Sequence, residues 1–274
     1  MQPRLNIALK ACRSAADIIN NIYKSKDQDE LRSYDDLGQI LYINLIEQIA
    51  ESYPFNDKDC LGPTNIDLSN IKDRFTHMNF KSDINDENKF IWVINPIDSY
   101  ENFVNKIPIF NITISIFLNG IVQAALIYNP VLDELVTAIR GEGALYENKK
   151  IRNTSVNNNK ILYVIDETKL TMKLNKILDG NERKLGSKST ELTYMAEGRL
   201  DLTIYSEIDV WDSAAGLLIC KESGVIVTDH NGEDNIYERR SLLAAREGKK
   251  EVTMVFIEEA LERVIAGPKR KSRV

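Results

Sequence analysis

The chain has 274 residues, 43% of them hydrophobic and 28% charged, which is typical of a folded globular protein and excludes a disordered one. Its formal net charge of -6 at pH 7 argues against a surface that is basic overall and coats nucleic acid, although a local patch could still bind it. Three widely spaced cysteines and two histidines give little support to a disulfide framework, a zinc site or a histidine-based triad.

The N-terminal part of the chain predicts two amphipathic helices. The opening MQPRLNIALKACRS has no apolar segment typical of a signal peptide, so we expect a cytoplasmic protein. Apolar residues recur at helical spacing over residues 4–24 and again over about 37–52, where the second helix ends near Pro54. Residues 62–88 are rich in Asn, Asp and Lys and predict a long surface segment.

A strand-rich region follows the surface segment. Residues 107–128 are the most apolar stretch, but apolar and polar side chains alternate there with a period of two, which predicts a strand and not a membrane span. Asn119-Gly120 is a strong hairpin signal between two such strands. The other elements predicted here are strands at 89–95 and 134–139 and a hairpin-like unit around Gly141–Gly143 and Glu147-Asn148.

The chain after about residue 160 alternates strands with helices. The predicted strands are 161–165, 200–205, 224–228 and 241–245, and the predicted helices are 168–178, 188–197, 211–222 and 250–264. Strands followed by helices indicate a layered α/β arrangement. We therefore expect a single domain over residues 1–274, with an N-terminal α+β half at 1–155 and a C-terminal α/β half at 156–274.

Two short stretches carry acidic side chains where predicted elements end or begin. INPIDSYENF, residues 94–103, follows a buried strand, and a Pro-containing turn with acidic oxygens there is a common way to hold a hard cation. In the second stretch, WDSAAG, Asp212 lies at a predicted helix start. Aspartate is favoured there because its carboxylate caps free N–H groups, so a purely structural role is also open.

Taken together, NPIDSYENF and WDSAAG resemble the DPLDGTTNF and WDxAAG signature pair of the inositol monophosphatase family. The segment from IPIFNITISIFLNG to LVTAIRGEGALYENKKIR is similar to the family's central strands in order and spacing. MQPRLNIALKACRSAADII and GRLDLTIYSEIDVWD resemble its bacterial SuhB (extragenic suppressor) branch. The resemblance covers most of the chain and implies an α/β fold, a five-layered αβαβα sandwich, that is often a dimer.

The resemblance implies Mg²⁺-dependent hydrolysis of small phosphate monoesters, in which metal ions bridge phosphate oxygens and activate a water. The implied metal ligands are Asp98, Asp212 and the Ile97 carbonyl, with Asn95 in place of a first aspartate. Asparagine offers one neutral carbonyl oxygen instead of two anionic oxygens. An acidic pair expected after the second helix is replaced by CLGPT, which ends at Thr64, so the pattern's four carboxylates become two.

The positions that the resemblance assigns to water and substrate also depart from the pattern. Tyr100 stands where a threonine positions water, and its ring could fill the metal or phosphate space. Glu101 replaces a threonine at a helix start that holds phosphate, where a carboxylate repels an anion. A GSAALD-like motif keeps its first two residues but has Lys188 and Thr190 further on. The implied substrate positions are Ser99, in place of a glycine, Tyr100, Gly186, Ser187 and Tyr205, in place of a glutamate.

Two hypotheses follow from this mixture of kept and lost residues. In the first, the protein is catalytically impaired and acts by binding, with the transcription-complex or RNA partners that the SuhB branch implies. The basic residues 269–273 could contact RNA phosphate or be a solvated chain end. In the second, it is an active phosphomonoesterase of the inositol-1-phosphatase type with a rearranged metal site. That site would recruit Asp57, Asp59, Asp67 or Asp73. A small phosphorylated ligand and a homodimer fit either.

Overall fold

The computed structural model describes most of the chain. The described residues are 1–24, 34–53, 58–63, 78–79, 84–85, 87–153, 160–166 and 180–246, with backbone alone at 34–36, 58–59 and 78–79. Within these residues, none of the helices combines the length and apolarity needed to cross a bilayer.

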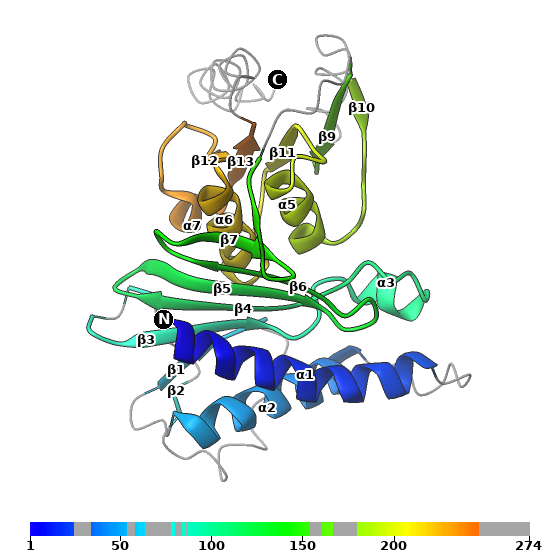
Figure 1. Ribbon diagram of the computed structural model, residues 1–274, viewed down its shortest axis with the longest axis vertical. Coiled ribbons are helices and arrows are strands. Elements are labelled where there is room, and N and C mark those ends of the chain that lie inside the picture. Colours follow the sequence, from blue (N-terminus) through cyan, green and yellow to red (C-terminus); the bar gives the residue numbers. More distant parts are fainter. Residues whose placement is uncertain are drawn as a thin grey trace, which may run out of the picture.

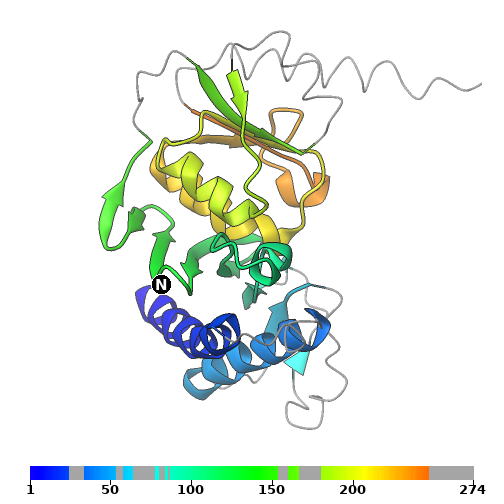
Figure 2. The same cartoon turned by 90° about the vertical axis from the view of Figure 1, so that its right-hand side faces the viewer.

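Helices and sheets alternate as layers (Figure 1). α1 (Gln2–Lys24) and α2 (Tyr34–Ser52) cover one face of an eight-stranded sheet. α5 (Lys188–Ala196) and α6 (Val210–Ser223) lie between that sheet and a five-stranded sheet. The view turned by 90° shows the same separation (Figure 2). The order helix, sheet, helix, sheet agrees with the first four layers expected from the sequence.

The eight-stranded sheet has the order β2-β1-β3-β4-β5-β6-β7-β8. β1 runs parallel to β2 and β3, and each pair from β3 to β8 is antiparallel. Asn119 and Gly120 both have positive φ, 52° and 73°, as a tight hairpin turn between β4 and β5 requires. The bounds are β1 (Lys58–Leu61), β2 (Met78–Asn79), β3 (Phe90–Asn95), β4 (Ile112–Leu118), β5 (Ile121–Asn129), β6 (Glu134–Ile139), β7 (Gly143–Tyr146) and β8 (Lys149–Ile151).

The strands of this sheet bury both faces, which explains their apolar runs. In β3, Trp92 and Ile94 pack in the core under α1 and α2, whereas Ile91 and Val93 pack against α5 and α6. Successive side chains point to opposite faces of a strand, so one continuous apolar strand can supply two cores.

The five-stranded sheet has the order β10-β9-β11-β13-β12. β9 is parallel to β10 and β11, and β13 is antiparallel to both of its neighbours. The bounds are β9 (Ile161–Ile165), β10 (Gly180–Glu182), β11 (Leu202–Tyr205), β12 (Ile226–Thr228) and β13 (Leu242–Ala245), and two short helices are α3 (Tyr100–Val104) and α7 (Ile236–Arg239).

The structure confirms the predicted helices at 4–24, 37–52, 188–197 and 211–222 and the predicted strands, with ends shifted by up to five residues. It adds elements that the sequence did not predict: β1, β2, β10 and α7. α3 begins at Tyr100, next to Glu101, where the resemblance implied a helix start. The helices predicted at 168–178 and 250–264, and most of the surface segment at 62–88, lie outside the described residues.

Candidate metal and phosphate site

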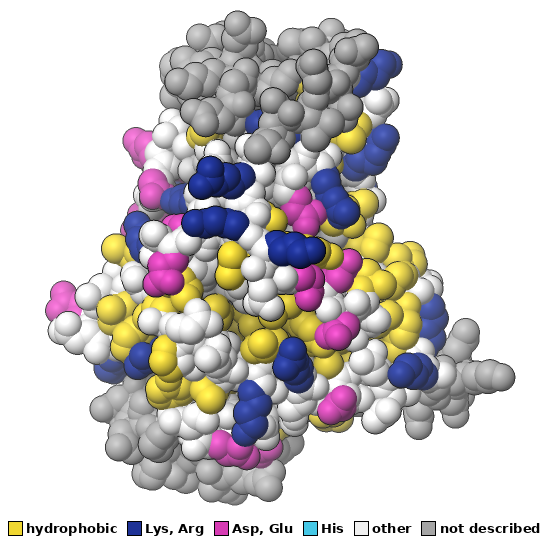
Figure 3. All heavy atoms as spheres, viewed as in Figure 1, with side chains coloured by type: hydrophobic (Ala, Val, Ile, Leu, Met, Phe, Trp, Pro, Cys, Tyr) yellow, Lys and Arg dark blue, Asp and Glu magenta, His cyan; other side chains and the backbone are white. Residues whose placement is uncertain are grey.

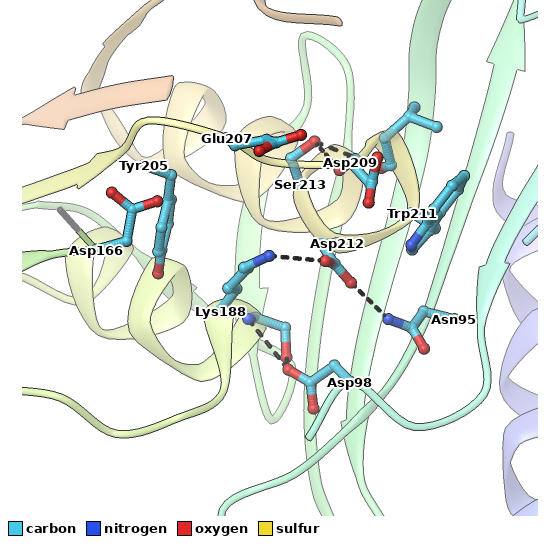
Figure 4. Close-up of polar contacts among 12 residues, drawn as sticks. Asn95, Asp98, Asp166, Lys188, Tyr205, Glu207, Asp209, Trp211, Asp212 and Ser213 are labelled. Atoms are coloured by element: carbon cyan, nitrogen blue, oxygen red, sulfur yellow. Dashed lines mark hydrogen bonds and ion pairs between the residues drawn. The ribbon is translucent and has the colours of Figure 1, made fainter. Parts of the chain in front are cut away.

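The turn after β3 meets the start of α6 at one end of the eight-stranded sheet. β3 pairs with β4 along its length, Asn95 opposite Thr113, and the N–H of Asp98 donates to the Asn111 carbonyl at 3.0 Å. The Thr113 hydroxyl donates to the Trp211 carbonyl at 3.3 Å. These contacts bring Asp98 and Asp212, which are far apart in the chain, to the same end of the sheet (Figure 4).

The carboxylate of Asp98 lies among hydrogen-bond donors of the protein itself. Its Oδ1 accepts from the N–H of Asn111 at 2.7 Å. Its Oδ2 accepts from the Ser187 hydroxyl at 2.6 Å and from both the hydroxyl and the N–H of Ser189. Burial raises the pKa of Asp98, and these hydrogen bonds oppose that rise because they favour the ionised form.

Asp212 is held by two different side chains (Figure 4). Its Oδ1 accepts from Asn95 Nδ2 at 2.8 Å, and its Oδ2 forms an ion pair with Lys188 Nζ at 2.9 Å. The Oδ1 of Asn95 accepts from the N–H of Ile97 at 3.2 Å, so the asparagine presents its amide nitrogen and not its carbonyl oxygen to Asp212. A ligand role for Asn95 through its oxygen does not fit this orientation.

Asp212 does not cap its own helix, which corrects the structural role considered from the sequence. The N-cap residue of α6 is Asp209, and the carboxylate of Asp212, in the first turn, is used by Asn95 and Lys188. A carboxylate in the first turn still interacts favourably with the helix dipole.

The residues described here do not fit a two-metal centre as they stand. Mg²⁺ requires several oxygen ligands in near-octahedral geometry, with carboxylates that supply negative charge. All four oxygens of Asp98 and Asp212 accept from protein donors. In the described part of the chain, no three His, Cys, Asp or Glu side chains gather as a metal-binding group.

The stretch CLGPT, which stands in place of the family's acidic pair, begins in β1. Cys60 is fully buried in β1, where it pairs with Trp92 of β3. A Cβ added to Gly62 would lie 2.4 Å from a ring carbon of Tyr42, so only glycine fits there. Thr64 lies outside the described residues, as do Asp57, Asp67 and Asp73 and the side chain of Asp59.

The structure shows how Ser99 and Tyr100, two residues that depart from the family pattern, are accommodated. Ser99 has φ of -143°, so its backbone does not need a glycine. The ring of Tyr100 packs against the core under α1 and α2, 6.0 Å from the ring of Phe103. The prediction that this ring could fill the metal or phosphate space has no support from these contacts. Glu101 is exposed in the first turn of α3.

The positions predicted to bind substrate in the C-terminal half contact other residues of the protein. Gly186 has φ of +79° and packs closely on Asn102, and Ser187 is the N-cap of α5. Tyr205 is only 2% exposed, and its hydroxyl donates to Glu191. Burial raises the pKa of Tyr205, and the nearby Glu191 charge raises it further. Tyr205 is therefore a buried partner of Glu191.

Three residues of this site were not recognised in the sequence: Asn111, Ser189 and Glu191. Asn111 Nδ2 donates to the hydroxyls of Ser189 and Thr190 at 2.7 and 2.8 Å. Glu191 accepts from the N–H of Leu185 at 2.8 Å and is 4% exposed. The one available signal was a run of polar residues, SKSTE, at the start of an otherwise buried helix.

The model of the inositol monophosphatase family matches residues 1–264 of the chain. The Nus factor SuhB of Pasteurella multocida is 33% identical over 266 residues, which cover 89% of this chain and 92% of that protein. The Nus factor SuhB of Escherichia coli K12 is 28% identical over 259 residues, 86% of this chain and 88% of that protein.

Solved structures share the fold. Inositol monophosphatase II of Staphylococcus aureus superimposes with a TM-score of 0.79 at 22% identity, over 97% of this chain and 99% of that one. The extragenic suppressor protein SuhB of Bartonella henselae gives 0.74 at 24% identity, over 94% and 99%. The fold class expected from the resemblance is confirmed, and the chain belongs to the inositol monophosphatase family.

Proposed function

We propose that this protein acts mainly through binding, in a transcription-associated complex, and that its phosphate-ester hydrolysis is absent or strongly impaired. The observation that carries this proposal is the use of all four oxygens of Asp98 and Asp212 by Asn95, Lys188 and the donors around Ser187. A carboxylate has about four lone-pair positions, so a cation at Asp98 or Asp212 would compete with these donors for the same oxygens.

The chemistry of metal-assisted hydrolysis explains why this matters. When bound, Mg²⁺ ions would neutralise phosphate charge and activate a water. Asp98 and Asp212 are the residues that would hold them, but Asn95 adds no anionic oxygen and CLGPT, at the position of the acidic pair, contains no carboxylate. Loss of one strongly used interaction costs roughly 10²- to 10³-fold in rate, and several losses within one unit are not simply additive.

The binding role is supported by the relatives named Nus factor SuhB, which are similar over most of the chain. We infer a protein surface of a transcription complex as the partner. On the face shown in Figure 3, basic and acidic side chains are interspersed with apolar ones, so a broad basic surface for RNA is not what this face offers. The basic residues 269–273 lie outside the described residues, and RNA contact there stays a prediction.

The alternative is an active Mg²⁺-dependent phosphomonoesterase of the inositol-1-phosphatase type. Its support is the shared fold, including an inositol monophosphate-bound structure of the Staphylococcus aureus enzyme at a TM-score of 0.76. Since that likeness is at 22% identity, it supports the fold and not the substrate.

Hydrolysis of inositol monophosphate and of a generic phosphomonoester, with and without Mg²⁺, separates the two functions. We expect the purified full chain to release no Mg²⁺-dependent phosphate above the level of Asp98→Asn, which serves as the matched control. If the unsubstituted chain releases phosphate in the presence of Mg²⁺ and Asp98→Asn does not, the binding proposal is wrong. Capture of transcription-complex proteins by the tagged chain, unchanged in Asp98→Asn, is the positive result expected.

A further inference from the structure

The ion pair between Lys188 and Asp212 lies where the family pattern places a metal ligand. Lys188 Nζ is 2.9 Å from Asp212 Oδ2, and the two side chains are 35% and 18% exposed. We propose that Lys188 is a tethered cation that takes the place of a divalent ion at Asp212, so that this site keeps its arrangement without metal. The inference deepens the proposed function and rests on it.

The position of Lys188 is fixed by the same hydrogen bonds that hold Asp98. Lys188 is the first residue of α5, directly after the N-cap residue Ser187. Ser187 donates to Asp98 Oδ2 at 2.6 Å, and the N–H of Ser189 donates to the same oxygen at 3.2 Å. The residues on both sides of Lys188 therefore donate hydrogen bonds to Asp98. The Lys188 side chain extends from this anchored backbone to Asp212 (Figure 4).

The charges around Asp212 favour this assignment. Its other oxygen accepts from the neutral amide of Asn95, so Lys188 supplies the formal positive charge that neutralises the carboxylate. In the part of the chain that the structure describes, Asp212 forms an ion pair with no other basic side chain. A carboxylate that is mostly buried loses hydration and needs such a counter-charge.

An ammonium in contact with Asp212 also opposes a divalent ion at the same oxygen. Two cations within a few ångströms repel each other strongly in a partly buried site. The ammonium is covalently attached and is not lost by dilution or chelation. The arrangement should therefore be insensitive to metal removal, and Asp212 should become available to a metal when the ammonium is removed.

The test measures the melting temperature of the full chain in EDTA and across a Mn²⁺ titration. The variants are Lys188→Met, Lys188→Gln, which keeps a donor but removes the charge, and Lys188→Met combined with Asp212→Asn. The matched control is Lys184→Met, which removes an exposed lysine paired with Glu182 at 3.2 Å. Lys188→Gln also carries the test if Lys188→Met does not fold.

For the unsubstituted chain, and likewise for Lys184→Met, we expect the melting temperature in Mn²⁺ to equal that in EDTA. Both Lys188 variants should melt about 2–4 °C lower in EDTA and regain stability in Mn²⁺. The Mn²⁺ response should disappear in the double variant, because Asp212 no longer offers an anionic oxygen.

Equal Mn²⁺ responses in the unsubstituted chain and the Lys188 variants would overturn the inference. So would a loss of stability no larger than that of Lys184→Met, or a loss that Mn²⁺ does not reverse. The melting experiment does not depend on hydrolysis. Phosphatase activity in the unsubstituted chain would therefore count against the proposed function, whereas the melting data alone decide the role of Lys188.

Discussion

At the scale of single residues, the site is defined by which donors face each carboxylate. Asp98 accepts from two serine hydroxyls and two backbone N–H groups, and Asp212 from an amide and an ammonium. Aspartates with such different partners perform different tasks. Asp98 joins the turn after β3 to the start of α5, and Asp212 joins α5 to α6 and β3.

Ser189→Ala tests the first of these connections. Ser189 is fully buried, and its hydroxyl donates to Asp98. Since a hydrogen bond to a charged group contributes about 1.5–3 kcal/mol, we expect the free energy of unfolding in urea to fall by that amount. Ser14→Ala, on the helix α1 away from the site, should change it by less than about 0.5 kcal/mol. Similar losses in both variants would contradict the assigned role.

Glu191 and Tyr205 give the protein a pH-dependent contribution to stability. Burial raises the pKa of Glu191, and the Asp98 charge raises it further, while bonds from Tyr205 and Leu185 lower it in part. A carboxyl whose pKa is raised on folding contributes stability below its unfolded pKa and loses it as pH rises through the folded value.

Glu191→Gln removes that titration while it keeps an acceptor for Leu185 and lets the Tyr205 hydroxyl accept from the new amide. The free energy of unfolding of the unsubstituted chain, minus that of the variant, should fall as pH rises from about 4 to about 8. Urea unfolding across this range measures the difference. A difference that is constant or grows with pH would show that Glu191 does not titrate as a buried carboxyl.

Sequence reasoning at this scale brought Asp98, Asp212 and Asn95 together because all three lie in short recognisable motifs. It placed Lys188 and Ser187 on the substrate side and did not pair them with the aspartates. It missed Asn111 and Ser189. The Asn111 amide donates to the Ser189 hydroxyl although the two residues are 78 positions apart, and this contact forms only once α5 is packed in place. The direction of the Asn95 amide likewise follows only from its neighbours.

At the scale of elements, the close packing of α5 on α6 sets the geometry of the site. A Cβ at Gly216 would lie 2.5 Å from Leu192 Cδ1 and 2.6 Å from its Cβ. Gly216 is the last residue of WDSAAG, and its lack of a side chain allows this close approach. The distance between the helices in turn sets where Lys188 and Asp212 meet.

Two glycine substitutions on one helix compare packing with backbone conformation. Gly216→Ala should lower the free energy of unfolding by about 1–3 kcal/mol or more, because the methyl group overlaps buried atoms of Leu192. Gly224, the C-cap residue of α6, has φ of 92° and open space around its Cβ position. Gly224→Ala should therefore cost only about 1–2 kcal/mol, the penalty of a left-handed residue. Urea unfolding that ranks Gly224→Ala as the more costly would contradict the packing account.

The elements that the sequence did not predict are short strands and one short helix, α7, whose own residues carry little signal. β10 is Gly180–Glu182, and its place beside β9 is fixed by pairing with a neighbour. Local propensity is weak over three residues, so tertiary contacts decide such strands. The long amphipathic helices and the Asn119-Gly120 hairpin were predictable because periodicity and turn chemistry are both local.

At the scale of the whole molecule, the described layers converge on one end of the eight-stranded sheet. The turn after β3, the start of β4 and the first turns of α5 and α6 meet there (Figures 1 and 4). The family's architecture is kept, and the carboxylates that remain at its centre bind other residues of the chain. A fold can be retained while the chemistry of its site changes, since the site depends on only a few side chains.

The central claim is that Asp98 and Asp212 are held by the protein's own donors and do not hold a pair of metal ions. A crystal of the full chain soaked in Mn²⁺, with anomalous diffraction data, tests it most directly. We predict no anomalous peak within about 2.5 Å of either carboxylate, and Lys188 Nζ still in contact with Asp212. Two peaks about 3.5–4 Å apart, with both carboxylates turned toward them and Lys188 displaced, would contradict it.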